Sequence, residues 1–237
     1  MEEISVSGIV LSAMPYREKD KLIHIFTVEL GKVTAILKGV SSPNSKLKFA
    51  GQPFCFAKFD LAGSGEILTV KGVELIDSFF DLTSDYDKFV TASTMLELSS
   101  IVLKPGIIME STFLSLIKSL QNIVYNGIDY RMATLKFVLT LLDNIGYGLN
   151  FNSCDNCGMK IVGDVKFSID LGTFRCSACS GGVKMDKKDF MSLKIIYGTS
   201  IDRLHTIKIS DDTITSLLKL MLDNISNKLG TRLRSVK

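Results

Sequence analysis

The sequence predicts an α+β protein in which an N-terminal β-barrel is followed by a helical region with a cysteine-rich insert. The first 80 residues contain short runs of strand pattern separated by turns, whereas helical periodicity begins near residue 84. Four of the five cysteines lie within residues 154–179, between two helical segments. The predicted domains are residues 1–80 for the barrel, 81–150 and 184–237 for the helical domain, and 151–183 for the insert.

The predicted strands of the first domain are short and closely spaced. They cover Ile4–Leu11, Leu22–Val28, Lys32–Lys38, Phe54–Leu61 and Ile67–Ile76. Gly31 and Gly63-Ser64-Gly65 provide the backbone freedom that tight turns require. Alternation places Cys55, Ala57, Phe59 and Leu61 on one face of the fourth run. Five strands with few intervening helices favour a small closed barrel; an OB-fold, an SH3-like barrel and a sandwich all fit this pattern.

Helical patterns follow the barrel. The predicted helices run from Ser84-Asp85 to about Leu103, over Ser111–Tyr125, from Asp129 to Gly146-Tyr147-Gly148, over Asp186–Tyr197, and from Ser210-Asp211-Asp212 to Leu229. The last helix has the clearest 3.6-residue period, and its Ser-Asp-Asp start is typical of an N-cap. These segments predict a helical domain that the insert divides.

The cysteines of the insert form two Cys-x-x-Cys pairs. Cys154 and Cys157 are separated from Cys176 and Cys179 by 18 residues, a spacing typical of paired zinc knuckles. Zinc prefers four soft ligands at tetrahedral corners, and four thiolates leave no open position for catalysis. The sequence therefore predicts one structural zinc ion that holds together a segment with little apolar content. A rubredoxin-like iron site fits the same spacing, whereas a redox pair would need a βαβ context.

Composition points to a folded cytoplasmic protein. Hydrophobic residues make up 46% and charged residues 22% of the chain, and the apolar runs are far too short to span a membrane. The acidic start, Met1-Glu2-Glu3, is unlike a signal peptide. His24 and His205 are the two histidines, and neither stands in a catalytic motif. We therefore expect no enzymatic activity.

Basic residues suggest where nucleic acid could bind. Lys38, Lys46 and Lys48 lie in a polar loop after the third predicted strand, and Arg17 precedes the second. Residues 201–237 carry seven basic and four acidic residues, with Lys228, Arg232 and Arg234 near the C-terminus. Such cations can track phosphates, although a solvated loop and a favourable helix-end charge explain them equally simply.

Several short segments, taken in order, resemble the bacterial recombination-mediator family RecO. The matching segments are Gly8-Ile9-Val10-Leu11, Arg17-Glu18-Lys19-Asp20-Lys21-Leu22, Phe26-Thr27-Val28-Glu29-Leu30-Gly31-Lys32, Lys38-Gly39-Val40, Ser45-Lys46-Leu47, Gln52-Pro53-Phe54, Leu142-Asp143-Asn144-Ile145-Gly146-Tyr147, the four cysteines, and Leu229-Gly230-Thr231-Arg232-Leu233-Arg234-Ser235. Together they cover essentially the whole chain.

The resemblance implies an OB-fold, a helical domain and an embedded zinc knuckle. It also implies a cytoplasmic, nucleoid-associated DNA-repair protein that binds single- and double-stranded DNA and anneals complementary strands. The implied protein partners are RecR, the acidic C-terminal tail of single-stranded DNA-binding protein, and indirectly RecA.

The resemblance suggests roles for individual residues as well. It makes Lys38, Lys46 and Lys48 candidate DNA contacts and Arg131 a candidate contact for the acidic tail; Arg131 as a solvent-facing helix residue is the alternative. Ser41-Ser42-Pro43 stands where family members often carry arginines, which weakens the charge of the loop. Two other functions remain open: an RNA-binding protein of translation or RNA processing, and an electron-transfer protein built on the cysteine site.

Overall fold

The computed structural model describes residues 3–235, which divide into two compact units. The chain through Phe89, together with Leu96–Leu114, forms the first unit; Val90–Met95 and the chain from Ser115 onward form the second. Helices α1 (Tyr86–Val102) and α2 (Glu110–Tyr125) therefore contribute residues to both units. No helix in the described part of the chain is long and apolar enough to span a membrane.

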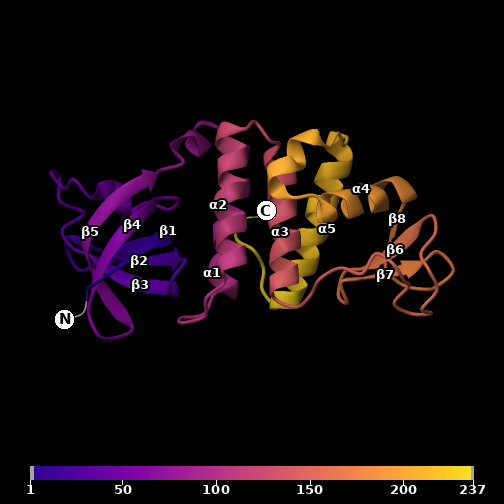
Figure 1. The fold of residues 1–237 in the computed structure, drawn as a ribbon, viewed down its shortest axis with the longest axis horizontal. Coiled ribbons are helices and arrows are strands. Elements are labelled where there is room, and N and C mark those ends of the chain that lie inside the picture. Colours follow the sequence, from indigo (N-terminus) through magenta and orange to yellow (C-terminus); the bar gives the residue numbers. More distant parts are fainter. Residues whose placement is uncertain (1–2, 236–237) are drawn as a thin grey trace. The chain divides into compact units, whose positions relative to one another are not determined.

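The first unit is built on a closed five-stranded barrel. Its strands are β1 (Glu3–Tyr16), β2 (Asp20–Thr27), β3 (Gly31–Leu37), β4 (Phe56–Ala62) and β5 (Ile67–Asp77), coloured indigo to purple in Figure 1. They follow the order β1-β2-β3-β5-β4, with β4 closing onto β1. The β3–β5 pair is parallel and the other pairs are antiparallel. The predicted barrel of the OB type is confirmed.

Strand β1 extends beyond the predicted end at Leu11. Its register with β2 shifts between Val10 and Ser12, and pairing continues as far as Tyr16 opposite Asp20. Such an irregularity bends a strand and allows it to follow a curved barrel wall. Apolar and polar residues alternate less regularly beyond a bend. The strand predicted from alternation therefore ends before the observed strand does.

Alternating side chains fill the barrel interior. Ile23, Ile25, Ala35, Ala57 and Phe59 are completely buried there. The four residues predicted to share one face of the fourth run all belong to this core: Cys55, Ala57, Phe59 and Leu61. Cys55 belongs to the same core, and burial raises the pKa of its thiol to about 12. This cysteine therefore stays protonated and apolar near neutral pH.

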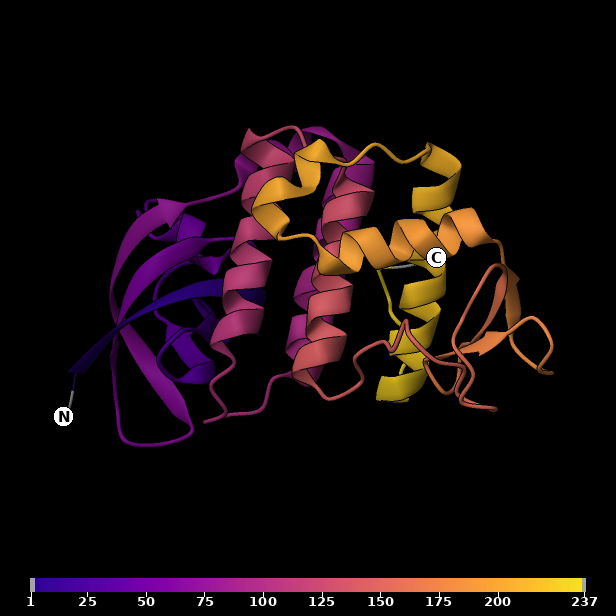
Figure 2. The same cartoon turned by 45° about the vertical axis from the view of Figure 1, so that its right-hand side comes forward.

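Three helices dominate the second unit. Helix α3 (Tyr130–Asn144) packs beside α5 (Asp211–Leu229), and α4 (Lys187–Gly198) packs against both, as the turned view in Figure 2 shows. Two hydrogen bonds join α3 to the C-terminal end of α4: the Tyr197 hydroxyl donates to Asp143 (2.6 Å), and the Lys136 ammonium donates to the Tyr197 carbonyl (2.7 Å). These bonds bring together the two helices that flank the insert.

Three short 3₁₀ helices complete the helical elements within residues 3–235. They are η1 (Lys48–Gly51), η2 (Phe80–Ser84) and η3 (Ile201–Thr206). The first begins at Lys48, in the segment that the sequence reads as a polar loop. Their buried residues, such as Ala50 in η1 and Leu204 in η3, fix each turn against its own unit.

The cysteine-rich insert contains a three-stranded sheet. Strands β6 (Val165–Ser168), β7 (Thr173–Cys176) and β8 (Val183–Met185) follow the order β7-β6-β8. One face of this sheet packs into a group of aromatic rings, which we call the aromatic cluster: Phe151, Phe167, Phe174, Phe190 and Tyr197. The insert and α4 thus share a small apolar core.

Candidate metal centre and nucleic-acid interface

The four cysteines of the insert meet at one point. Cys154 and Cys157 lie on the turn that precedes β6, and Cys176 and Cys179 lie where β7 ends. The four sulfur atoms all lie within 4.8 Å of one another. Two of the sulfur pairs, Cys154–Cys179 and Cys157–Cys176, are each separated by 3.8 Å.

These spacings fit a single tetrahedral ion. Four thiolates at about 2.3 Å from zinc would lie roughly 3.8 Å from one another, which matches the two measured pairs. A set of four thiolates would complete the coordination shell and leave no position for water or substrate. The residues therefore fit a structural metal site, as the sequence predicted.

The thiols influence one another's ionisation. Backbone N–H groups, first that of Cys176, lower the pKa of Cys154 to about 6. For Cys157, the N–H of Met159 also lowers the pKa, but hydrogen bonding with Cys154 and burial raise it overall to about 12. One thiolate therefore opposes the next, and a full set of four requires a cation.

Helix α5 holds the middle of the insert. Three side chains on one face of the helix, at positions i, i+3 and i+4, bind three successive residues of the β6–β7 turn. The pairs are Asn224 with the Ile169 carbonyl (2.6 Å), Asn227 with the Asp170 carboxylate (3.0 Å) and Lys228 with the Leu171 carbonyl (2.8 Å). We call these three pairs the α5 contact. Lys228, a predicted DNA contact, also lies 4.9 Å from the ring centre of Tyr147, so its ammonium group is already engaged.

The other predicted C-terminal cations are exposed. Arg232 and Arg234 follow Gly230, whose left-handed backbone (φ 60°) ends α5. Arg232 also lines an open groove of about 1190 Å³ along α5, whose wall includes the apolar side chains of Leu218 and Leu222. The predicted DNA contacts of Arg232 and Arg234 stay predictions.

The predicted DNA contacts of the first unit gather at one end of the barrel. The turn between β1 and β2 carries exposed Arg17, whose guanidinium lies 5.2 Å from the ring centre of Tyr16. Exposed Lys38, Lys46 and Lys48 lie in the segment that follows β3. Lys48 donates to the Pro43 carbonyl (2.6 Å), which closes this segment on itself. We call the turn and the segment together the basic end of the barrel.

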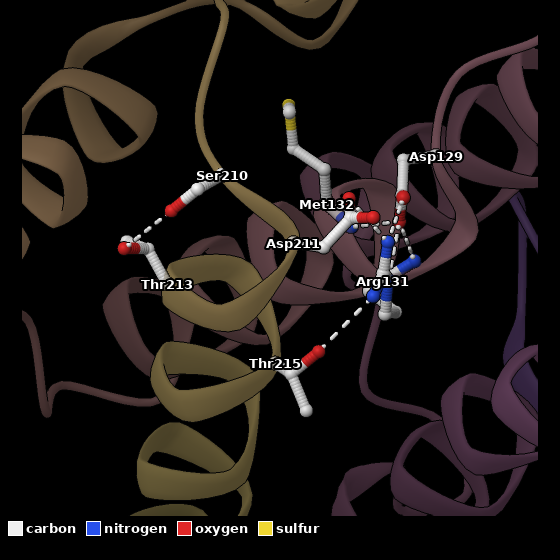
Figure 3. A network of polar contacts seen from close by, with 7 residues as sticks. All are labelled: Asp129, Arg131, Met132, Ser210, Asp211, Thr213 and Thr215. Carbon is white, nitrogen blue, oxygen red and sulfur yellow. Dashed lines mark hydrogen bonds and ion pairs between the residues drawn. The ribbon is translucent and has the colours of Figure 1, made fainter.

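Arg131 lies in a network between two helix N-termini (Figure 3). Its guanidinium donates to Asp129, the N-cap of α3, at 2.5 Å and to Asp211, the first residue of α5, at 2.9 Å. It also donates to the Thr215 hydroxyl (3.1 Å). An acidic partner would have to compete with Asp211 for this arginine, so the predicted partner contact stays a prediction.

The network has an expected pH dependence. Burial raises the pKa of Asp129, but the hydrogen bonds from Arg131 outweigh it and lower the pKa overall. The stabilisation is therefore complete above the unfolded-state pKa of about 4 and is lost as pH falls through the folded-state pKa. We expect Arg131→Gln to lower the free energy of unfolding by about 1 kcal/mol at pH 7. On acidification, the free energy of unfolding should then fall less in this variant than in the parent.

Urea unfolding at a series of pH values checks this expectation. Lys118→Gln is the matched control. Lys118 forms an exposed ion pair with Asp202 (2.7 Å), so its replacement should hardly change the free energy of unfolding. An acid profile of Arg131→Gln that is superimposable on the parent profile would contradict the assignment.

Sequence reasoning missed several residues that the structure brings to the metal centre or to the rest of the insert. Lys166 and Arg175 lie beside the second cysteine pair, and Asn224 holds the insert from α5 although its position reads as helix interior. A signal for Lys166 and Arg175 was available, because each alternates with apolar residues in its short strand. Nothing in the helical period distinguishes Asn224.

Comparison with known families assigns the whole described fold to proteins of DNA repair. The family model for the N-terminal domain of recombination protein O matches residues 1–79, and the model for its C-terminal domain matches residues 83–237. The chain therefore belongs to the RecO family.

Relatives with an assigned role agree. The chain is 32% identical over 232 residues to the DNA repair protein RecO of Clostridium novyi, covering 97% of this chain and 91% of that protein. It is 28% identical to the DNA repair protein RecO of Clostridium perfringens, over 100% of this chain and 97% of that protein. The corresponding protein of Streptococcus thermophilus is also 28% identical, over 100% and 93%. A role in recombinational repair follows from this membership.

Proposed function

We propose that this protein is a non-enzymatic recombination mediator. It binds single- and double-stranded DNA, anneals complementary strands and, with RecR, helps load RecA onto strands coated by single-stranded DNA-binding protein. It works in the cytoplasm, in association with the nucleoid. Membership of the RecO family and the basic end of the barrel support this proposal.

The basic end of the barrel is the observation that carries the DNA-binding part. Two hydrogen bonds join its turn to its segment: the Ser41 N–H donates to the Lys19 carbonyl (3.0 Å), and the Gly39 N–H donates to the Asp20 carboxylate (2.8 Å). Exposed Arg17, Lys19 and Lys38 therefore come from two segments that are bonded to each other. Cations from two connected segments can contact successive phosphates of one strand.

Annealing follows from the same chemistry. Two complementary strands repel each other through their phosphates until cations reduce that charge. A protein that neutralises the backbone without reading base edges leaves the bases available for pairing. We also propose zinc as the ion of the cysteine site, where it stabilises the insert and takes no part in contacts with DNA.

Charge reversal in the basic end tests the proposal. We expect Lys46→Glu/Lys48→Glu to weaken binding of single-stranded DNA by about tenfold or more at low salt, to reduce the salt dependence of the affinity, and to slow annealing. Binding is measured by fluorescence anisotropy over a salt series. Annealing is measured with and without single-stranded DNA-binding protein.

Lys58→Glu/Lys71→Glu is the matched control. Both lysines are exposed on strands β4 and β5 of the same barrel but lie outside the basic end, so this variant has the same charge change. Lys46→Glu alone separates lost charge from the lost Lys48–Pro43 bond. Equal affinities for the two double variants would remove the basic end from the proposal. A marked preference for RNA over DNA of equal length would contradict the DNA assignment itself.

A further inference from the structure

Three cations stand side by side on the sheet of the insert. Lys166 on β6 pairs directly with Arg175 on β7 and with Lys184 on β8. Residues that oppose one another share a face of a sheet, so the three side chains form one row. The opposite face carries buried residues such as Phe167 and Phe174. Like charges that directly oppose each other destabilise a sheet, so this row requires a compensating negative charge.

The nitrogen atoms of two of these cations show where that compensation lies. The Lys166 ammonium donates to the carbonyls of Ser177 (2.9 Å) and Cys179 (2.6 Å). The Arg175 guanidinium donates to the carbonyl of Ser180 (2.9 Å). All three carbonyls belong to the turn 176–180, which carries the second pair of metal ligands.

The backbone is shaped to allow these contacts. Gly181 adopts a left-handed conformation (φ 82°), and a Cβ added there would lie 2.6 Å from a terminal nitrogen of Arg175. Glycine suits this left-handed backbone and leaves room for the guanidinium where it now lies. A trans peptide points its N–H opposite to its carbonyl. Cations that hold these carbonyls consequently fix the direction of the N–H groups in the same turn.

The charges of Lys166 and Arg175 balance the charge expected for the loaded metal site. A divalent zinc ion with four thiolates carries a net charge of about −2, and the side chains of Lys166 and Arg175 together carry about +2 at neutral pH. We propose that Lys166 is a positioning residue of the metal centre: with Arg175, it offsets the negative charge of the loaded site and fixes the turn that bears Cys176 and Cys179. This inference rests on the ion proposed above and is independent of DNA binding.

Zinc affinity of the full-length protein tests the inference. Competition with a chromophoric chelator should show binding to Lys166→Gln weakened by about 10- to 100-fold. Lys184→Gln removes the same charge from the same row, but Lys184 is exposed on the other neighbouring strand; this control should keep the parent affinity. Lys166→Arg, which retains the charge and the donors, should recover part of the loss.

The spectrum of the cobalt(II)-loaded protein distinguishes weaker metal binding from a general loss of folding. At saturating cobalt, Lys166→Gln should still show the spectrum of tetrahedral four-thiolate coordination, because all four ligands remain. Equal zinc affinities for Lys166→Gln and Lys184→Gln would overturn the inference, as would loss of the tetrahedral spectrum in Lys166→Gln. A parent protein that binds no zinc would instead refute the proposed ion, so the two failures are distinguishable.

Discussion

Replacing Cys176 with serine is expected to abolish stoichiometric zinc binding and to lower the free energy of unfolding by on the order of 4 kcal/mol. Cys176 provides one of four convergent sulfur atoms, and its sulfur lies 3.8 Å from that of Cys157. Energy from metal binding becomes folding energy when the site exists only in the folded chain. For a chain of 237 residues this loss corresponds to a melting temperature lower by roughly 10 °C. Thermal unfolding and zinc content per chain are measured together.

Cys55→Ala is the control for this experiment. Cys55 is 2% exposed in the barrel core and belongs to a different unit from the metal centre. The variant should retain one zinc ion per chain and lose only about 1 kcal/mol through the small cavity that it leaves. A Cys176→Ser protein that melts with the parent would show that the ion does not stabilise the fold.

Replacing Phe174 with alanine is expected to destabilise the second unit by about 3–5 kcal/mol. Phe174 is 1% exposed and is central to the aromatic cluster. Its ring centre lies 5.1 Å from that of Phe151 and 5.0 Å from that of Phe190. Urea unfolding measures the loss. The four ligands remain, so added zinc should recover part of it by mass action.

Phe80→Ala tests whether burial, and not phenylalanine content, determines this effect. Phe80 is 73% exposed, so its truncation should change the free energy of unfolding by less than about 0.5 kcal/mol. A comparable loss in both variants would mean that the aromatic cluster contributes no particular stability to the insert.

The elements with a strong local signal were predictable. Strands such as β3 and β4 alternate apolar and polar residues, and helices such as α5 keep a 3.6-residue period with recognisable caps. The metal ligands were predictable for a related reason, because a Cys-x-x-Cys turn brings two sulfurs together locally. Only the meeting of the two turns needed the tertiary fold.

The roles of individual cations were not predictable, because each role depends on a distant partner. Lys228 reads as a basic helix end, yet it bonds to Leu171, 57 positions earlier in the chain. Arg131 reads as a surface residue, yet it joins Asp129 to Asp211, 80 positions later. Sequence spacing describes neighbours on one element, whereas these contacts cross between elements.

The apolar content of the insert was also underestimated. Phe151 precedes the first cysteine pair and Phe190 follows the second, so the segment between the pairs does not reveal the whole apolar core. They pack against Phe174 from the flanking segments and complete a core that no single segment contains. A core assembled from several segments has no periodic signal in any one of them.

The bonds between α3 and α4 have a consequence for the order of events during folding. Tyr197 and Asp143 join the two helices that flank the insert without involving any sulfur, and Lys136 adds a second bond. The α5 contact holds the middle of the insert at the β6–β7 turn in the same way. The helices can therefore gather the insert into a closed loop before an ion arrives. Since much of the loop entropy is lost by then, the ion would bind a chain that is already partly ordered.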